Sequence, residues 1–511
     1  MRGVPVLSDE EVTPAESFRD ARERIRSELG GVEKVEAIHE RGEQTVRERI
    51  DALIDEGTFR EIGTFARSLR AQDRPRTPGD GKIGGHARID GRPVTIVGDD
   101  ITVKRATSSV VGATKAWRLL DQALAAGQPV IYIGETGGAR LPDAIGAEGF
   151  SALRIPWPNA RRRHVPMATA IVGQSFGGSS FVAAASDFVV QVRGSTLAVT
   201  SPRVVEVAIG ESVGFEELGG VEVHARITGQ IDRVAETDDE AFALIRRWLG
   251  YLPSNAWSRP PRGESADVAY DPELGTLVPE RRNRGYDIRR ILERVLDDRS
   301  LLELQPDYGR GVLCGLGRID GHAIGVVANQ PKFLGGTLGP DECQKITRLL
   351  CLCDAFTLPV VILQDCPGIF VGRRVEHDRL LHRVIRLIQA LTDSVTPKLT
   401  IVLRQAYGAA FFALGGSLMG SDSLCAWPGA EIGFMEPRIG ANVLFGEAAT
   451  EEHIAQLARS TSVFDAAAVM SIDEVIDPGE TRPMLAARLD ELAHRPIAPP
   501  EERPLAWWPM C

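Results

Sequence analysis

Short hydrophobic runs alternate along most of the chain with stretches in which hydrophobic residues recur at helical spacing. The clearest succession is 94–97, 112–126 and 129–133, which predicts a strand, a helix and a second strand. This alternation is typical of an α/β fold. Ahead of it, residues 16–56 are rich in Arg and Glu at helical spacing and predict a helical arm whose charges face solvent. Residues 74–85 carry proline and glycine and predict a loop.

The same features occur twice in the same order. They are residues 87–91 with 317–321 and 134–138 with 364–368, at an offset of 230, then Gln174 with Gln405 at 231 and Ser186-Asp187 with Ser421-Asp422 at 235. An offset that drifts so little indicates an internal duplication. We therefore predict two homologous α/β domains, residues 1–263 and 264–511, with their boundary in the proline-rich stretch 253–279.

Each predicted domain contains a strand that turns through glycine into small residues. One such stretch is Ile171 to Ser180, and its distant copy is Ile401 to Ala410. The N–H groups in the first turn of a helix lack partners within the helix, and the helix dipole adds to their attraction for a negative oxygen. The two turns therefore predict two oxyanion sites. The alternative is that small residues here only allow close packing of strand against helix.

A second candidate element is the loop from Gly137 to Arg140, which follows the hydrophobic run 130–133. Glycines after a strand let backbone amides face a ligand, and Arg140 would either hold a phosphate or brace the loop. Two basic clusters, Lys104-Arg105 and 161–164, would either attract a phosphorylated ligand or be solvated. No G-x-S-x-G motif accompanies the serines near Gly177, which argues against a serine nucleophile.

Composition and charge exclude several classes of protein. The formal net charge of −11 makes nucleic acid an unfavourable partner. The seven cysteines include no C-x-x-C pair, and the nine histidines show no metal-ligand spacing, so neither a disulfide framework nor a metal site is expected. The sequence shows no signal peptide and no hydrophobic run of the ~20 residues that span a bilayer, so we expect a cytoplasmic protein without membrane contact.

Further motifs reveal a resemblance to a known family. They include Arg47–Leu53, Gly137–Arg140, Leu218–Gly220, Gln305–Gly309, Gly325–Pro331, Ala426–Pro428 and Ile476–Pro478. In these motifs, and over nearly its whole length, the chain resembles the carboxyltransferase (beta) subunits of biotin-dependent acyl-CoA carboxylases, such as those for propionyl-CoA and methylcrotonyl-CoA. The resemblance implies two crotonase-like domains in one chain. It also implies a hexamer in which a ring of three stacks on a second ring of three.

The resemblance further implies the reaction. Carboxybiotin, carried by a separate biotin carboxylase or carrier subunit, supplies CO2 to the α, or vinylogous γ, carbon of an acyl-CoA thioester, through an enolate. No metal and no side-chain base is required. In the family arrangement Gly177 and Gly178 bind the enolate oxygen. The biotin ureido oxygen is bound by Gly408, Ala409 and Ala410, and the CoA ester lies along Gly137, Gly138, Ala139 and Arg140.

Two departures from the family pattern concern the acyl pocket. Phe412 stands where many members have an aspartate that lines this pocket, which suggests an acceptor nearer the methylcrotonyl-CoA branch. The stretch 379–386 is bulkier than the small, glycine-bearing helix of the family. Two alternatives therefore stay open. One is an acyl-CoA decarboxylase of the same fold, and the other is a non-catalytic scaffold subunit of a carboxylase complex.

Overall fold

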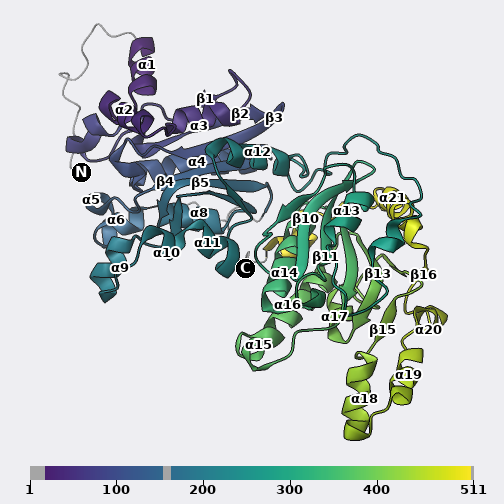
Figure 1. Cartoon of the computed structure of the whole chain (residues 1–511). Helices are drawn as coiled ribbons and strands as arrows, with labels where there is room; N and C mark the ends of the chain where they lie inside the picture. Colours follow the sequence, from purple (N-terminus) through teal and green to yellow (C-terminus); the bar gives the residue numbers. More distant parts are fainter. Residues whose placement is uncertain (1–17, 154–162, 508–511) are drawn as a thin grey trace.

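The computed structural model describes residues 18–153 and 163–507 of the chain. It contains two α/β bodies, one from each half of the sequence (Figure 1). Each body is built on an eight-stranded sheet. Among the described residues, no helix has both the length and the apolar character needed to cross a bilayer.

The first half begins with three short helices and then alternates strands with helices. Its strands are β1 (Arg60–Glu61), β2 (Lys82–Ile89), β3 (Arg92–Asp99), β4 (Val130–Thr136), β5 (Met167–Phe176), β6 (Phe188–Val192), β7 (Thr196–Ala198) and β8 (Arg233–Ala235). Its helices are α1 (Phe18–Glu28), α2 (Val32–Glu40), α3 (Val46–Leu53), α4 (Val110–Ala126), α5 (Leu141–Ala144), α6 (Ala147–Ala152), α8 (Gly178–Ala184), α9 (Pro202–Ile209), α10 (Phe215–Gly219), α11 (Val221–Val223) and α12 (Asp238–Leu249).

The second half repeats this plan. Its strands are β9 (Leu302–Leu304), β10 (Val312–Ile319), β11 (His322–Asn329), β12 (Val360–Cys366), β13 (Lys398–Tyr407), β14 (Ser423–Ala426), β15 (Glu431–Gly433) and β16 (Glu474–Val475). Its helices are α13 (Arg289–Val295), α14 (Pro340–Ala355), α15 (Arg373–His377), α16 (Leu380–Asp393), α17 (Ala409–Ala413), α18 (Pro437–Phe445), α19 (Glu451–Arg459), α20 (Val463–Ala468) and α21 (Thr481–Leu492).

The two sheets have the same topology, which confirms the predicted duplication. The strand order in the first sheet is β1-β2-β3-β4-β5-β6-β8. In the second sheet it is β9-β10-β11-β12-β13-β14-β16. In each, an antiparallel hairpin leads into parallel strands. The hairpin turns are Asp90-Gly91 and Asp320-Gly321, all with positive φ, as a two-residue type I′ turn requires.

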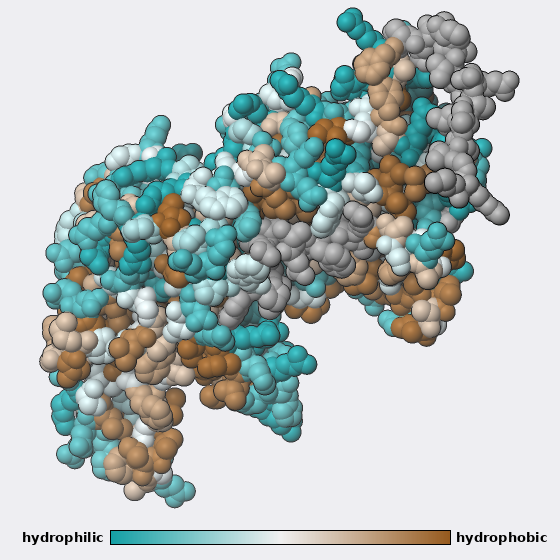
Figure 2. Space-filling model, turned by 180° about the vertical axis from the view of Figure 1, so that it is seen from behind, coloured by the Kyte–Doolittle hydropathy of each residue, from teal (hydrophilic) through white to brown (hydrophobic). Residues whose placement is uncertain are grey.

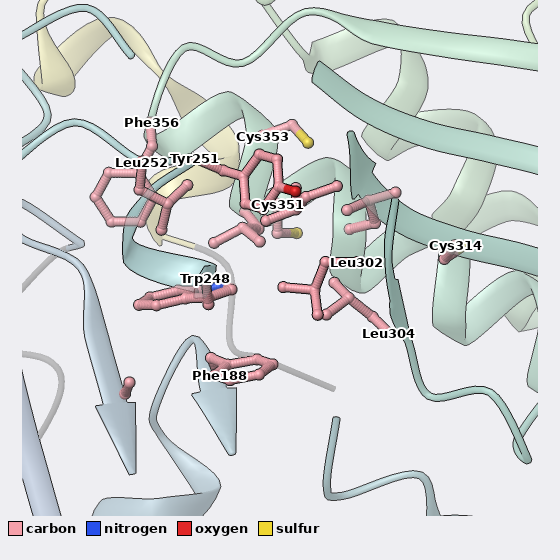
Figure 3. Close-up of a cluster of buried hydrophobic side chains, with 14 of the residues drawn as sticks. Phe188, Trp248, Tyr251, Leu252, Leu302, Leu304, Cys314, Cys351, Cys353 and Phe356 are labelled. Atoms are coloured by element: carbon pink, nitrogen blue, oxygen red, sulfur yellow. The ribbon is translucent and has the colours of Figure 1, made fainter. Parts of the chain in front are cut away.

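A shared hydrophobic core joins the two halves. Phe188 of β6 stacks on Trp248 of α12 with ring centroids 5.3 Å apart, and this pair packs toward Leu302 and Leu304 of β9 and toward α14 (Figure 3). Beside this core, Arg348 of α14 forms a buried ion pair with Asp232 at 2.8 Å. The orientation of the two halves is therefore fixed by burial as well as by the linker.

The predicted helical arm consists of three separate helices, because the chain turns at Gly31 with φ 128° and again after α2. One predicted boundary was wrong. The predicted loop 74–85 ends earlier, since β2 starts at Lys82 and pairs with β3 along its whole length. The strands that lead into the two candidate turns run to Phe176 and Tyr407, because β7 and β15 pair with their second halves.

Candidate functional site

The first candidate oxyanion turn lies where the carboxyl end of β5 meets α8. Gly177 adopts φ 64° and ψ −123°, a conformation that suits glycine, and Gly178 begins the helix. The amide of Gly177 donates to Val199 O at 3.1 Å, so this N–H is already used. The next amide, that of Gly178, stands in the first helical turn, where no helical carbonyl can accept it. Gly178 is half-buried, so its N–H is the donor this turn offers to a ligand.

The second turn repeats this geometry between β13 and α17. Gly408 has φ 60° and ψ −147°, and its amide donates to Gly433 O at 2.9 Å. Ala409 and Ala410 follow in the first turn of the helix. Ala410 is fully buried whereas Ala409 is exposed, so the accessible amide is that of Ala409. In both halves the glycine makes the turn and the following residue presents its N–H.

The glycine loop after β4 lies against the first turn. Gly138 has φ 102°, its carbonyl accepts from Ser108 N at 2.8 Å, and its Cα is 3.7 Å from the position a Cβ on Gly177 would occupy. A Cβ on Gly178 would itself come within 3.3 Å of the Ser108 hydroxyl. The sequence motifs at residues 137–140 and at Gly177-Gly178 therefore form one site at the carboxyl edge of the first sheet, where open α/β sheets bind ligands.

Arg140 connects this loop to the start of α4 through buried contacts. Its guanidinium is 2.6 Å from Asp80, and both side chains are buried. Asp80 also accepts from the Gly112 amide near the start of α4 at 3.1 Å, and Arg140 N donates to Ser108 O at 2.9 Å. Of the two roles open for Arg140, the structure favours bracing over phosphate binding.

Arg49 lies close to the site, although the helical spacing of residues 16–56 did not predict this. The charges of the helical arm were expected to face solvent, but Arg49 is buried, 2.5 Å from Glu135 and 2.7 Å from Asp238. Burial raises the pKa of Glu135, and the Arg49 charge opposes that shift. Glycine at 173 makes room for the Glu135 carboxylate, because a Cβ there would overlap it. The motif Arg47–Leu53, which contains Arg49, contributed to the family resemblance. It did not show where in the fold Arg49 lies.

The second half places a comparable acidic residue at the end of β12. Asp365 is buried, 3.0 Å from Arg404, and accepts from the Tyr286 hydroxyl at 2.8 Å. Burial raises the pKa of Asp365 despite Arg404, and burial beside this carboxylate raises the pKa of Tyr286 well above its usual value. Each acidic group is thus held by an arginine close to the candidate turns, and neither is exposed as a base.

The serines near Gly177, and Arg163 of the second basic cluster, have structural roles. Ser175 and Ser179 share a hydrogen bond of 2.6 Å, and the Ser180 hydroxyl donates to Gly177 O at 2.7 Å. Arg163 is buried and lies 3.3 Å from Asp187, while residues 161 and 162 are outside the described residues. Within the described ranges, no three His, Cys, Asp or Glu side chains are grouped so that they could hold a metal ion.

A large cavity opens beside the first site. Its volume is about 960 Å³, and it includes Gly137, Gln174 and Glu135 in its wall. Cationic side chains line it as well, namely Lys34, Arg41, Arg49, Arg105 and Arg193. An equal number of acidic side chains lines it too, namely Glu43, Glu135, Glu236, Asp238 and Asp239. The cavity therefore has no excess of positive groups, but its size and the glycine loop at one side suit a long ligand.

The two departures noted in the sequence lie in the second half. Phe412 of α17 is 43% exposed, three residues after the Ala409 amide. The bulky stretch forms the start of α16, whose first turn follows Arg379 at φ 60°, and Leu381 and Ile385 there are exposed. Both groups are therefore available to a ligand or a neighbouring protein.

Fold and site together define a class of enzyme: two crotonase-like domains in one chain, each presenting a backbone amide at a strand-to-helix turn. Residues 37–504 match the family model of the carboxyl transferase domain. The chain belongs to this family and is a carboxyltransferase.

Individual relatives agree with this assignment. The chain is 33% identical, over 96% of its length and 99% of the relative, to the propionyl-CoA carboxylase carboxyltransferase subunit of Haloferax mediterranei. It is 32% identical, over 91% of its length and 93% of the relative, to the methylmalonyl-CoA decarboxylase alpha subunit of Veillonella parvula. Among solved structures it is similar to transcarboxylase 12S, a hexamer with methylmalonyl-CoA bound, with TM-score 0.89 and 31% identity over 96% of this chain and 98% of that one.

Proposed function

We propose that this chain transfers a carboxyl group from carboxybiotin, carried by a partner subunit, to an acyl-CoA thioester. The observation that carries the proposal is the Gly178 amide, which stands without a helical acceptor beside the glycine loop and next to a large cavity. Loss of the α-proton makes the thioester oxygen negative, and this amide, with the α8 dipole behind it, stabilises that charge.

The second turn fits a neutral carbonyl oxygen such as that of the biotin ring. Ala409 is exposed, and its N–H has no acceptor inside α17. Carboxybiotin held there would supply the CO2 and, once its N–CO2 bond has broken, the base for the α-proton. The Ala409 amide would hold the ureido oxygen, on which negative charge develops in that step. The chain's own acidic groups near the turns, Glu135 and Asp365, are paired with arginines, so they serve as supports.

The complete site is proposed to form between copies of the chain. The two turns belong to different halves of one molecule (Figure 1), so a neighbouring copy would bring a second turn to the first. Exposed hydrophobic residues gather on α18 (Val443 68%, Leu444 65%), at the projecting end of the second half (Figure 2), and on the corresponding helix α9 (Val207 70%, Ile209 71%). Such patches mark protein interfaces. We propose a hexamer, with the biotin subunit as a further partner.

The direct test is an assay of the purified chain with a biotin carboxylase, a biotinylated carrier and ¹⁴C-bicarbonate against several acyl-CoA thioesters. Carrier-dependent fixation of label into an acyl-CoA is expected. The similarity to the Veillonella parvula subunit is the observation in support of the alternative, a decarboxylase. It predicts release of CO2 from malonyl-type thioesters and no net fixation. A scaffold subunit would show neither activity.

Replacing Phe412 by aspartate is expected to change the choice of acyl group. The exposed aromatic side chain would be exchanged for a smaller, charged one. Because a single methylene group in a hydrophobic pocket is worth about 10- to 200-fold in discrimination, the ratio of kcat/KM for propionyl-CoA over 3-methylcrotonyl-CoA should rise about tenfold or more. The control, Phe412→Leu, is also smaller than phenylalanine but stays apolar, so its ratio should change less than that of Phe412→Asp. An unchanged ratio in Phe412→Asp would place this residue outside the acyl pocket.

A further inference from the structure

The turn after β3 has an unusual backbone. Lys104, Arg105 and Ala106 have φ values of 51°, 54° and 52°, so three consecutive residues with side chains are left-handed. Residues other than glycine adopt this conformation at a cost, and usually singly. The turn is therefore strained, and it adjoins the candidate site.

The internal duplication allows the turn at residues 104–106 to be compared with its counterpart in the second half. At an offset of 230 the second half has Leu334, Gly335 and Gly336, with φ values of 48°, 66° and 81°. Both turns are closed in the same way, since Ala106 N donates to Val103 O and Gly336 N to Phe333 O, each at 2.9 Å. The fold requires a left-handed turn in both halves, and the second half meets the requirement with two glycines. The fold alone therefore does not explain Arg105.

The contacts of Arg105 connect it to the site. Its carbonyl accepts from Gly137 N at 2.9 Å, and its guanidinium donates to the Gln174 side-chain oxygen at 2.8 Å. Its Cβ and Nε lie 3.4 and 3.5 Å from the position a Cβ on Gly137 would occupy. Arg105 thus runs past the glycine loop, in the wall of the 960 Å³ cavity, and it is exposed there.

The charge of Arg105 is not neutralised by a carboxylate. Arg41 and Arg193, which also line the cavity, lie 2.7 Å from Glu43 and 2.9 Å from Glu236. Arg105 donates to a neutral amide instead, and among the residues that the structure describes no carboxylate lies within 4.0 Å of it. A guanidinium with free donors at the edge of a cavity is well suited to bind a phosphate or a carboxylate.

We propose that Arg105 is a specificity-determining residue that binds a negatively charged group of the thioester substrate, and that the strained turn is retained because it places this guanidinium beside Gly137. The inference rests on the proposed function. The negative group belongs either to the phosphates of CoA or to a carboxylate at the acyl end, and the two sources predict different responses to substitution.

The test is equilibrium binding of acetyl-CoA and malonyl-CoA to the wild-type chain and to Arg105→Gly, by titration calorimetry. Loss of a charge-assisted hydrogen bond is expected to raise Kd about tenfold or more. Arg105→Gly should unfold at a temperature no lower than wild type, because glycine relaxes the turn. The matched control, Ala106→Gly, relaxes the adjacent residue and keeps the guanidinium, so its Kd should stay at the wild-type value. Arg105→Lys should restore part of the affinity.

Each outcome has a definite meaning. Equal weakening for both esters assigns Arg105 to the CoA phosphates, and weakening confined to malonyl-CoA assigns it to the acyl carboxylate. Either result supports the proposal. Wild-type affinity of Arg105→Gly for both esters would overturn it and leave the proposed function standing. A wild-type chain that binds neither ester would overturn the proposed function, and this inference with it.

Discussion

Replacing Gly178 by proline is expected to lower kcat about 100- to 1000-fold, with little change in acyl-CoA affinity. Proline removes the N–H that the first turn offers to the substrate, and one donor to a developing oxyanion contributes ~3 kcal/mol in the transition state. Gly178 is the first residue of α8, a position that proline occupies readily, so the helix should persist. Steady-state kinetics of the complete complex, with circular dichroism as a check on folding, measure the effect.

The control for this substitution is Gly178→Ala, which keeps the amide. Its methyl group would approach the Ser108 hydroxyl to 3.3 Å, a tight contact that a small movement relieves, so only a modest loss of kcat is expected. A proline variant as active as the alanine variant would show that this amide takes no part in catalysis.

Replacing Arg140 by methionine is expected to reduce the free energy of unfolding by about 3–5 kcal/mol, because it leaves the carboxylate of Asp80 buried without its cation. The loop 137–140 should loosen too, since Arg140 connects it to the start of α4. Denaturant unfolding of the purified variant measures the change.

Arg193→Met is the matched control for Arg140→Met. Arg193 makes exposed ion pairs with Glu236 and Glu222, and surface pairs contribute little, so no measurable loss of stability is expected. A stability of Arg140→Met equal to that of Arg193→Met would show that the buried pair does not hold the loop.

The duplication and the two turns could be predicted from sequence because they depend on local signals. Glycine is needed where φ is positive, and both Gly177 and Gly408 meet that need after a hydrophobic strand. The Asp-Gly hairpin turns at 90–91 and 320–321 likewise recur at the offset of 230. The fold class follows from such signals.

Contacts between residues distant in sequence could not be predicted in this way. Arg49 meets Glu135 across 86 positions, and Arg140 meets Asp80 across 60, so a helical charge pattern or a loop motif leaves both partners unknown. For the same reason the sequence did not predict that the Gly177 and Gly408 amides donate hydrogen bonds to Val199 O and Gly433 O. The positions of the turns were predicted from the sequence. Which N–H group of each turn is free to bind a ligand could be seen only in the structure.

In the proposed reaction the Gly178 amide polarises the thioester carbonyl of the bound substrate. Isotope-edited infrared spectroscopy of an acyl-CoA with ¹³C at its thioester carbonyl measures this polarisation without requiring turnover. We expect the carbonyl band to move to lower wavenumber when the ester binds the wild-type chain or Gly178→Ala, and we expect this shift to be lost with Gly178→Pro. The same frequency with all three proteins would contradict this role of the amide.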